Sequence, residues 1–386
     1  MSSKHKTELI RQLVDQALHH QKTKNLVRTI TYENFDIHIT SAGQRGAYHI
    51  TATYQQGAGD TAINQLDVDA PDFQEQLQFI EDFAAEKQDL KAFGKRLFDF
   101  VFTRGISHLY VRYREALLDS GKGLRLRLQI DPPELNVLPW EYLYDESSDT
   151  FIAKQTPTPI VRYIQQPYTP SFLSAAGKLK ILIVIASPGN YPTLDIEFEK
   201  SKIVEALAYI QTKVEIKFLE HATSFTLFQE IQNFDPHAFH FIGHGRYKNG
   251  EGSLLLEGQD GQAIPLAADQ LADLLYNRQT KIVILNACQT AAKSEHASAF
   301  NSVAQALVYK RIPAVFAMQF AVPDSLAVLF SQVLYEQLAI GKPLDQAVTE
   351  MRIAASVING EEHGAWGIPV LYMRAPDGYL WQDEEK

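Results

Sequence analysis

Cysteine is nearly absent from this sequence. Cys288 is the only cysteine among 386 residues. One cysteine excludes an intrachain disulfide, and it excludes a zinc or iron–sulfur site built from several cysteines of one chain. Because free thiols are usual in a reducing compartment, we expect a cytoplasmic protein.

Long apolar runs are also missing. The stretch nearest to a membrane span, from Val303 to Val322, is interrupted by Lys310, Arg311 and Pro313, whereas a span needs about 20 apolar residues. The charged N-terminus has no apolar signal core. We therefore expect a soluble protein that is not secreted.

Positive charge is in deficit. The 36 Lys and Arg residues face 46 Asp and Glu residues, which gives a net charge of −10. Direct binding to nucleic acid or to an anionic membrane needs a basic face, so we expect neither as a partner. The content of 45% hydrophobic and 21% charged residues is ordinary for a globular protein.

The first 177 residues show mixed periodicity. Helical spacing of apolar residues predicts a helix over 8–22, and alternation in FDIHIT and YHITATY predicts a β-hairpin. A polar, glycine-containing stretch follows over 55–61. Further helices are expected over about 72–86, 88–104 and 106–119, and strands near Leu124 and Ile160. We interpret residues 1–177 as an N-terminal mixed α/β region that packs on a sheet or extends it.

From Lys178 onward, short apolar strands alternate with amphipathic helices. KILIVIAS, AFHFIG, KIVILNA and PAVFAMQ are strands of the buried type. Such alternation is typical of a mostly parallel sheet with helices on both faces. The sequence thus predicts an α/β domain over residues 178–386.

Two strand ends carry groups with complementary chemistry. AFHFIG leads into His244 and Gly245, and KIVILN leads into Ala287 and Cys288. Functional groups of open parallel sheets gather past the C-terminal ends of the strands. If the two strands are neighbours, the imidazole can take the proton of the thiol and later pass it to a leaving amine.

The paired motifs FHFIGHG and VILNACQTA resemble those of the CHAT family, caspase-like cysteine peptidases of clan CD that are related to separase. GLRLRLQIDPPELNVLPWEYLYD with TPIVRYI resembles the lead-in of that family, and IPAVFAMQFAVPD, GKPLDQAV and WGIPVLY resemble its tail. About the first 65 residues contain no matching motif.

The resemblance implies a caspase-like sheet and a Cys–His dyad. Cys288 would be the nucleophile, His244 the general base, and the backbone N–H groups of Gly245 and Cys288 the oxyanion hole. Peptide bonds of a protein substrate would be hydrolysed through an acyl-enzyme without a cofactor or a metal. Asp324 would line the pocket for the substrate residue that precedes the scissile bond.

The resemblance also implies regulation. A caspase-like enzyme is expected to stay latent until a sensor or regulatory protein activates it, here in bacterial antiviral defence or programmed cell death. The segment Gly245 to Gly252, rich in Gly, Lys and Asn, is expected to be a mobile loop beside the site.

Each of these residues also has a structural interpretation. Cys288 could be a buried packing residue, His244 a polar group at a strand end, and Asp324 the N-cap of a helix over 325–340. Glu141 and Arg162 are interpreted as a structural ion pair or as solvated groups. His237, His240 and His244 could suggest a metal site, but strand geometry turns His237 away from the other two.

For the whole chain, the alternative function is a protein-interaction module of the CHAT type that is catalytically silent. The long N-terminal region without a known motif motivates this hypothesis.

Overall fold

The structure is a computed structural model that describes residues 29–55, 57–287, 293–320, 322–360 and 364–381. The helix predicted over 8–22 therefore lies outside the described residues.

The N-terminal region contains a three-stranded antiparallel meander followed by helices and a parallel strand pair. Its hairpin is confirmed, whereas the last strand of the meander occupies part of the polar stretch over 55–61, for which the sequence predicts no strand. That strand lies at the edge of the sheet, and every second residue of it is exposed, so its sequence carries little apolar signal. The elements in chain order are β1 (Tyr32–Ser41), β2 (Ala47–Tyr54), β3 (Ala58–Gln65), α2 (Pro71–Glu81), α3 (Lys87–Val101), α4 (Arg104–Asp119), β4 (Gly123–Ile130), α5 (Pro133–Asn136), η1 (Trp140–Tyr142), β5 (Tyr144–Asp145), β6 (Thr150–Phe151), η2 (Ile152–Lys154) and β7 (Ile160–Arg162).

The rest of the chain alternates strands with helices, as the apolar pattern predicts. Its elements are β8 (Leu179–Ile185), α6 (Ile196–Leu207), η3 (Ala208–Ile210), β9 (Val214–Leu219), α7 (Ser224–Phe234), β10 (Ala238–Lys248), β11 (Glu251–Glu257), β12 (Ala263–Ala267), α8 (Ala268–Leu275), β13 (Ile282–Ala287), α9 (Lys293–Tyr309), β14 (Ala314–Met318), α10 (Asp324–Ala339), α11 (Leu344–Asn359), η5 (Ala365–Gly367) and β15 (Pro369–Met373).

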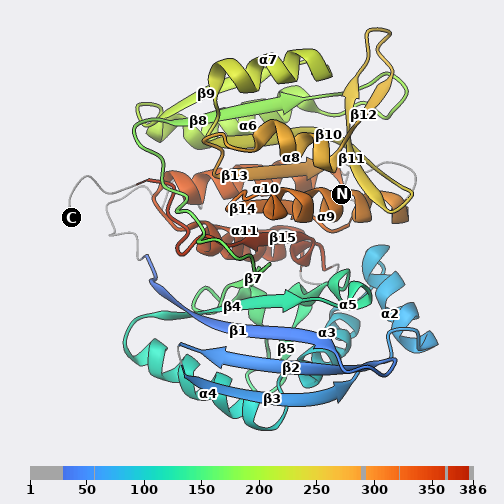
Figure 1. The fold of residues 1–386 in the computed structure, drawn as a ribbon, viewed down its shortest axis with the longest axis vertical. Helices are drawn as coiled ribbons and strands as arrows, with labels where there is room; N and C mark the ends of the chain where they lie inside the picture. Colours follow the sequence, from blue (N-terminus) through green and yellow to red (C-terminus); the bar gives the residue numbers. More distant parts are fainter. Residues whose placement is uncertain (1–28, 56, 288–292, 321, 361–363, 382–386) are drawn as a thin grey trace, which may run out of the picture.

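Thirteen of the described strands form one sheet that runs through the whole molecule (Figure 1). β9, β8, β10, β13 and β14 are parallel to one another. β15 is antiparallel to β14 and parallel to β7, which continues through β4 to β1. The strands near Leu124 and Ile160 therefore extend the sheet of the C-terminal part, as expected.

Two apolar cores cover the two faces of the C-terminal half of the sheet. Ile242 and Ile284 belong to the core that includes residues of α6, α10 and α11. Phe241 and Leu285 belong to the other core, with residues of α7, α8 and α9. Because side chains alternate along a strand, even-numbered residues of β10 and β13 face α6 and α10, and odd-numbered ones face α7 to α9.

The segment expected to be a mobile loop, Gly245 to Gly252, is a β-hairpin instead. β10 continues to Lys248 and pairs antiparallel with β11, so two residues remain for the turn. Asn249 and Gly250 have φ values of 55° and 84°. A two-residue hairpin turn with positive φ at both positions suits Asn-Gly, a signal that the loop interpretation overlooked.

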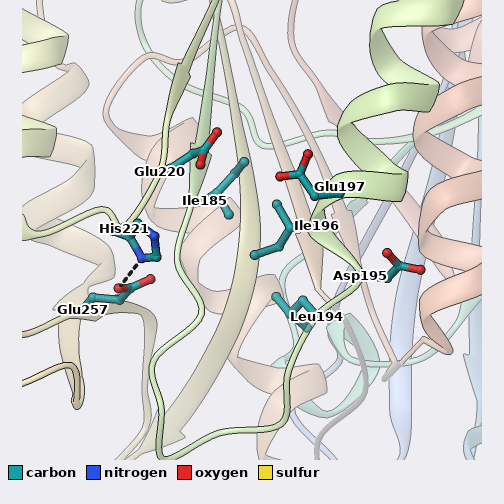
Figure 2. A pocket seen from close by; sticks show the side chains of 8 residues that line it. All are labelled: Ile185, Leu194, Asp195, Ile196, Glu197, Glu220, His221 and Glu257. Carbon is teal, nitrogen blue, oxygen red and sulfur yellow. Dashed lines mark hydrogen bonds and ion pairs between the residues drawn. The ribbon is translucent and has the colours of Figure 1, made fainter.

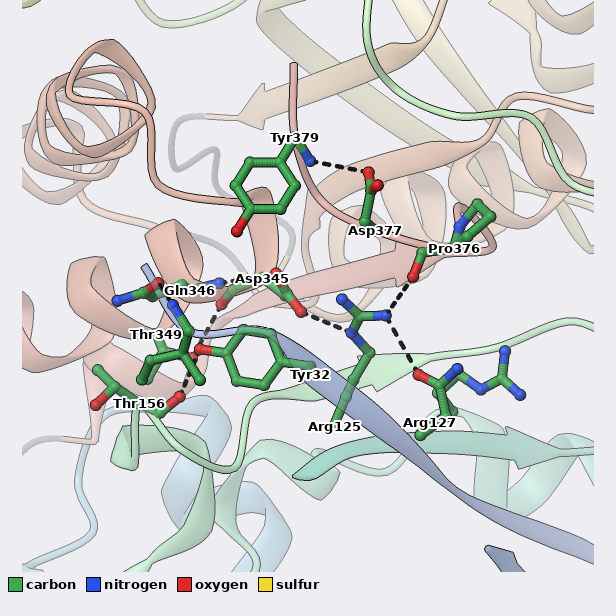
Figure 3. A network of polar contacts seen from close by, with 12 residues as sticks. Tyr32, Arg125, Arg127, Thr156, Asp345, Gln346, Thr349, Pro376, Asp377 and Tyr379 are labelled. Carbon is green, nitrogen blue, oxygen red and sulfur yellow. Dashed lines mark hydrogen bonds and ion pairs between the residues drawn. The ribbon is translucent and has the colours of Figure 1, made fainter. Parts of the chain in front are cut away.

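A buried ion pair joins the N-terminal strands to the C-terminal helices. The Arg125 Nε atom on β4 donates to Asp345 Oδ2 on α11 at 2.6 Å, and both side chains are almost fully buried. The same guanidinium donates to Asn34 Oδ1 at 3.2 Å and to the Pro376 carbonyl at 3.0 Å (Figure 3). Arg125 thus ties β1, α11 and the segment after β15 together.

The Asp345→Asn variant should lose about 3–5 kcal/mol of unfolding free energy, because it leaves the Arg125 charge buried without a counter-ion. Chemical denaturation measures this loss. The matched control is Asp273→Asn, which removes the exposed Lys310–Asp273 pair of 2.6 Å and should change the unfolding free energy far less, because exposed ion pairs contribute little to stability. Equal losses in the two variants would contradict the proposed importance of the buried pair.

Candidate active site

The two strands that carry the predicted dyad are neighbours. β10 and β13 pair in parallel from Ala238 opposite Ile282 to Gly243 opposite Ala287. The other side of β10 pairs with β8 up to Ile242, and from His244 onward it pairs with β11. β10 therefore does not end at His244, as its apolar run suggested, but changes partners there.

His244 is held by the segment that follows β8. Its Nε2 atom lies 3.0 Å from the carbonyl oxygen of Pro192, and the Tyr191 ring stacks on the imidazole with centroids 5.3 Å apart. Since a carbonyl oxygen only accepts, the neutral ring carries its proton on Nε2 and its lone pair on Nδ1. This tautomer leaves Nδ1 as the basic nitrogen. The side chain is 1% exposed, so bulk water has little access to it.

Cys288 lies outside the described residues. The described chain reaches Ala287, the last residue of β13, which is also the last partner of β10 in this ladder. The role of Cys288 as nucleophile stays a prediction, whereas the predicted proximity of the two strands is present.

Gly245 lies inside β10 opposite Leu254. A Cβ atom built there would be 2.5 Å from the Phe300 ring of α9. This close approach is a packing reason for glycine on the face opposite to that of His244. The proposed role of the Gly245 N–H as an oxyanion donor stays a prediction.

Asp324 is the first residue of α10, and Pro323 is the N-cap. The alternative in which Asp324 caps the helix is therefore wrong, because the helix begins one residue earlier than its apolar pattern indicates. The Asp324 side chain is not among the described groups, so its role in substrate binding stays a prediction.

The other two histidines of this segment have structural partners. His240 Nδ1 lies 3.0 Å from the Tyr335 hydroxyl of α10, and burial lowers the pKa of His240 to about 3. His237 Nδ1 accepts from the Lys180 backbone N–H at 3.0 Å, and its Nε2 lies 3.1 Å from Gln279 Oε1. Among the described residues, no group of three or more His, Cys, Asp or Glu side chains is arranged to hold a metal ion.

The Glu141–Arg162 pair is the buried structural ion pair that the sequence suggested. Arg162 donates through Nε and a terminal nitrogen to the two carboxylate oxygens, at 3.0 and 2.7 Å. Burial alone would raise the pKa of Glu141, but the charge and hydrogen bonds of Arg162 hold it below its ordinary value. Gln319, just past β14, donates to the same carboxylate at 3.0 Å. The pair therefore anchors the segment that leads toward α10.

An acidic pocket of about 300 Å³ adjoins the segment that holds His244 (Figure 2). It lies between the ends of β8, β9 and β11, and it is lined by Ile185, Leu194, Asp195, Ile196, Glu197, Glu220, His221 and Glu257.

Two of the pocket's carboxylates share one cation. Lys200 donates to Glu197 at 3.0 Å and to Glu220 at 2.6 Å. These hydrogen bonds raise the pKa of Lys200 and lower the pKa of Glu220. Glu257 accepts from the Ser187 N–H at 2.8 Å and lies 3.0 Å from His221 Nδ1. With four carboxylates and one lysine, the pocket carries net negative charge at neutral pH.

Three buried polar residues below the end of β13 were missed by the sequence analysis. Asn286, Glu199 and Ser331 lie on β13, α6 and α10 and share hydrogen bonds. The sequence could have indicated Asn286, since it is a polar residue in the apolar run KIVILNA and a buried polar side chain needs hydrogen-bond partners. It held no such indication of Glu199, because that residue stands among other charged residues of a helix.

Among the described residues, no helix combines the length and the apolar composition that crossing a bilayer requires.

Comparisons with known proteins agree with this architecture. The family model described as CHAT domain matches residues 91–363. No curated protein sequence matches the chain. A Saccharomyces cerevisiae separase–securin complex is similar to the chain with a TM-score of 0.54 and 11% identity, over 89% of this chain and 30% of that chain.

Two further structures are less similar. The Drosophila initiator caspase Dronc has a TM-score of 0.35 and 10% identity, over 58% of this chain and 96% of that chain. The complex of Porphyromonas gingivalis RgpB pro- and mature domains has a TM-score of 0.41 and 11% identity, over 78% of this chain and 76% of that chain. Of these three structures, only the separase complex has a TM-score above 0.5. At 11% identity, its similarity shows the fold alone. The chain spans 30% of the separase chain that it matches. The predicted caspase-like, mostly parallel sheet with helices on both faces is confirmed.

The environment of His240 predicts a pH-dependent stability. Its pKa is about 3 in the folded protein against about 6.5 in an unfolded chain. The unfolded state therefore binds more protons below pH 6.5, and folding stability falls as pH decreases toward 3. Between about pH 7 and pH 5, wild type should lose about 2 kcal/mol more than His240→Gln does. Urea unfolding at the two pH values measures this difference, and parallel losses would contradict the assignment.

Proposed function

This chain belongs to the CHAT domain family, and we propose that it is a cysteine endopeptidase with Cys288 as nucleophile and His244 as general base. The observation that carries the proposal is the parallel pairing of β10 with β13, which ends at Gly243 opposite Ala287. The next residue along each strand is the predicted base and the predicted nucleophile.

Chain geometry supports this pairing of roles. Neighbouring strands lie about 4.8 Å apart, and the described β10–β13 ladder ends one residue before Cys288 along the chain. His244 is on the same face of β10 as Ile242, the α6 and α10 face. Asn286, two residues before Cys288 in the sequence, points to that same face, where it contacts Glu199 and Ser331.

The tautomer of His244 suits a general base. With Nε2–H bound to the Pro192 carbonyl, the Nδ1 lone pair would take the thiol proton, and the thiolate would attack the carbonyl carbon of the scissile peptide. The imidazolium would then give that proton to the leaving amine, forming a thioester. Water would hydrolyse the thioester with His244 again as base. Each step uses side chains of the chain itself, and none requires a cofactor.

The backbone N–H groups of Gly245 and Cys288 are proposed to hold the oxyanion of the tetrahedral intermediate. Two such donors usually supply a large part of the rate enhancement. The glycine required by Phe300 also leaves this part of β10 without a side chain that could cover its backbone.

We propose a basic substrate side chain before the scissile bond. Asp324 begins α10 close to the end of β14, and the acidic pocket lies at the ends of β8 and β9. The acidic pocket therefore borders one side of this edge of the sheet, and Asp324 would supply a second acidic group. A lysine or arginine of an extended substrate would be favoured there, and an acidic residue would be repelled.

Activation by a sensor or regulatory protein completes the proposal. Tyr191 and Pro192 cover the His244 ring, so a polypeptide would reach the site after this segment moves. Because Tyr191 and Pro192 already hold His244, latency would act on access of the substrate to this residue. By family resemblance, bacterial defence or programmed cell death in the cytoplasm is the proposed setting.

Cys288→Ala and His244→Gln should each reduce peptide cleavage by at least about a thousandfold, because each removes a partner in proton transfer to or from the reacting sulfur. The measurement is cleavage-site profiling of a peptide library in the presence of candidate activators, and wild type should cut after basic residues. His49→Gln, a substitution of an exposed histidine on β2, is the matched control. Full activity in the Cys288→Ala variant would refute the proposal.

The same burial of His244 also fits the second candidate function, a catalytically silent interaction module. Reactivity of the thiol separates the two. For the enzyme, iodoacetamide should alkylate Cys288 with an apparent pKa at least about one unit below the ordinary 8.5, and His244→Gln should restore the ordinary value. An apparent pKa at or above 8.5 in wild type would favour the silent module.

A further inference from the structure

A buried carboxylate lies beneath the end of β13. Glu199 on α6 is 2% exposed. Its Oε1 atom accepts from Asn286 Nδ2 at 2.5 Å and from Ser331 Oγ at 2.9 Å. Removing a carboxylate from water is costly unless hydrogen bonds compensate it, so its position here needs a specific reason.

The carboxylate fixes the orientation of the Asn286 amide. Nδ2 has three partners, namely Glu199 at 2.5 Å, the Ala327 carbonyl at 3.1 Å and Ser331 Oγ at 2.9 Å. A carboxylate and a carbonyl only accept hydrogen bonds, so the amide nitrogen must face them. The Ser331 hydroxyl donates to Glu199 and therefore accepts from Asn286. The amide cannot flip without breaking these bonds, and its oxygen Oδ1 is turned away from the carboxylate.

This network acts on the strand that leads to the candidate nucleophile. Asn286 is the penultimate residue of β13 and precedes Cys288 by two positions. Glu199 and Ser331 reach it from α6 and α10, the helices on the face of the sheet to which His244 also belongs. Two helices thus contact the end of β13 through hydrogen bonds to the Asn286 side chain.

We propose that Glu199 is a positioning residue for Cys288. Through Asn286 and Ser331, it holds the end of β13 so that the chain leaves the strand beside His244. This inference rests on the proposed function and names a residue outside the dyad on which that function depends.

The sign of one measurement distinguishes positioning from a direct effect of charge. A nearby negative charge disfavours a thiolate, so loss of the Glu199 charge alone would lower the pKa of the Cys288 thiol. Loss of positioning would instead move the thiol away from His244 and raise its pKa toward the ordinary value of about 8.5.

The test measures iodoacetamide alkylation against pH in the full-length chain. Because Cys288 is the only cysteine, intact-protein mass reports this thiol alone. Glu199→Ala should raise the apparent pKa by about one unit, which slows alkylation at neutral pH about tenfold. Glu199→Gln retains an acceptor oxygen and should keep most of the wild-type reactivity. Ser331→Ala, which retains the Glu199–Asn286 bond, should show an intermediate effect and serves if Glu199→Ala fails to fold.

Asp345→Asn is the matched control. Asp345 is also a buried carboxylate, but its partner is Arg125 on β4, which does not belong to the network around Glu199. This variant should lower stability without changing the thiol pKa. Provided that the Cys288 thiol of wild type has a lowered pKa, two results would overturn the inference. One is an unchanged thiol pKa in both Glu199→Ala and Ser331→Ala. The other is an equal decrease of the thiol pKa in Glu199→Ala and Glu199→Gln. An ordinary pKa in wild type would instead overturn the proposed function, and the inference with it.

Discussion

The parallel pairing of β10 with β13 is the constraint on which the rest of the site depends. Its register brings Gly243 opposite Ala287, and a slip of one residue would turn every side chain of one strand to the other face of the sheet. The two faces have separate apolar cores, so such a slip would expose one core and crowd the other. The same hydrophobic burial that stabilises the sheet therefore fixes the position of His244 relative to the end of β13.

β10 exchanges partners at the candidate site. β8 accompanies β10 as far as Ile242, and β11 takes over from His244. The segment that follows β8 passes the point where the partners change. Tyr191 and Pro192 of this segment contact the His244 imidazole. In open α/β sheets, ligands usually bind where neighbouring strands diverge. Here the two partners, β8 and β11, meet different parts of the single strand β10.

Buried carboxylates hold separate parts of this long sheet together. Asp345 binds Arg125, Glu141 binds Arg162, and Glu199 binds Asn286 and Ser331. The Asp345 and Glu199 contacts join elements that are far apart in sequence, and each of the three carboxylates is costly to bury without its partner. These contacts add directional constraints that apolar packing lacks, in a sheet whose strand direction reverses between β14 and β15.

The sequence by itself determined the alternation of strands and helices and the two motifs that contain His244 and Cys288. Those features rest on local periodicity and on residue chemistry, which a linear pattern contains. It did not reveal the edge strand β3, whose alternate residues are exposed, or the hairpin after His244, which an Asn-Gly turn closes. Only the tertiary structure decided that β10 and β13 are adjacent, that Nε2 of His244 faces Pro192, and that Glu199 lies under Asn286. These facts depend on which strands pair and which helices cross above them, and that choice is made by burial of the whole chain and not by any segment of it.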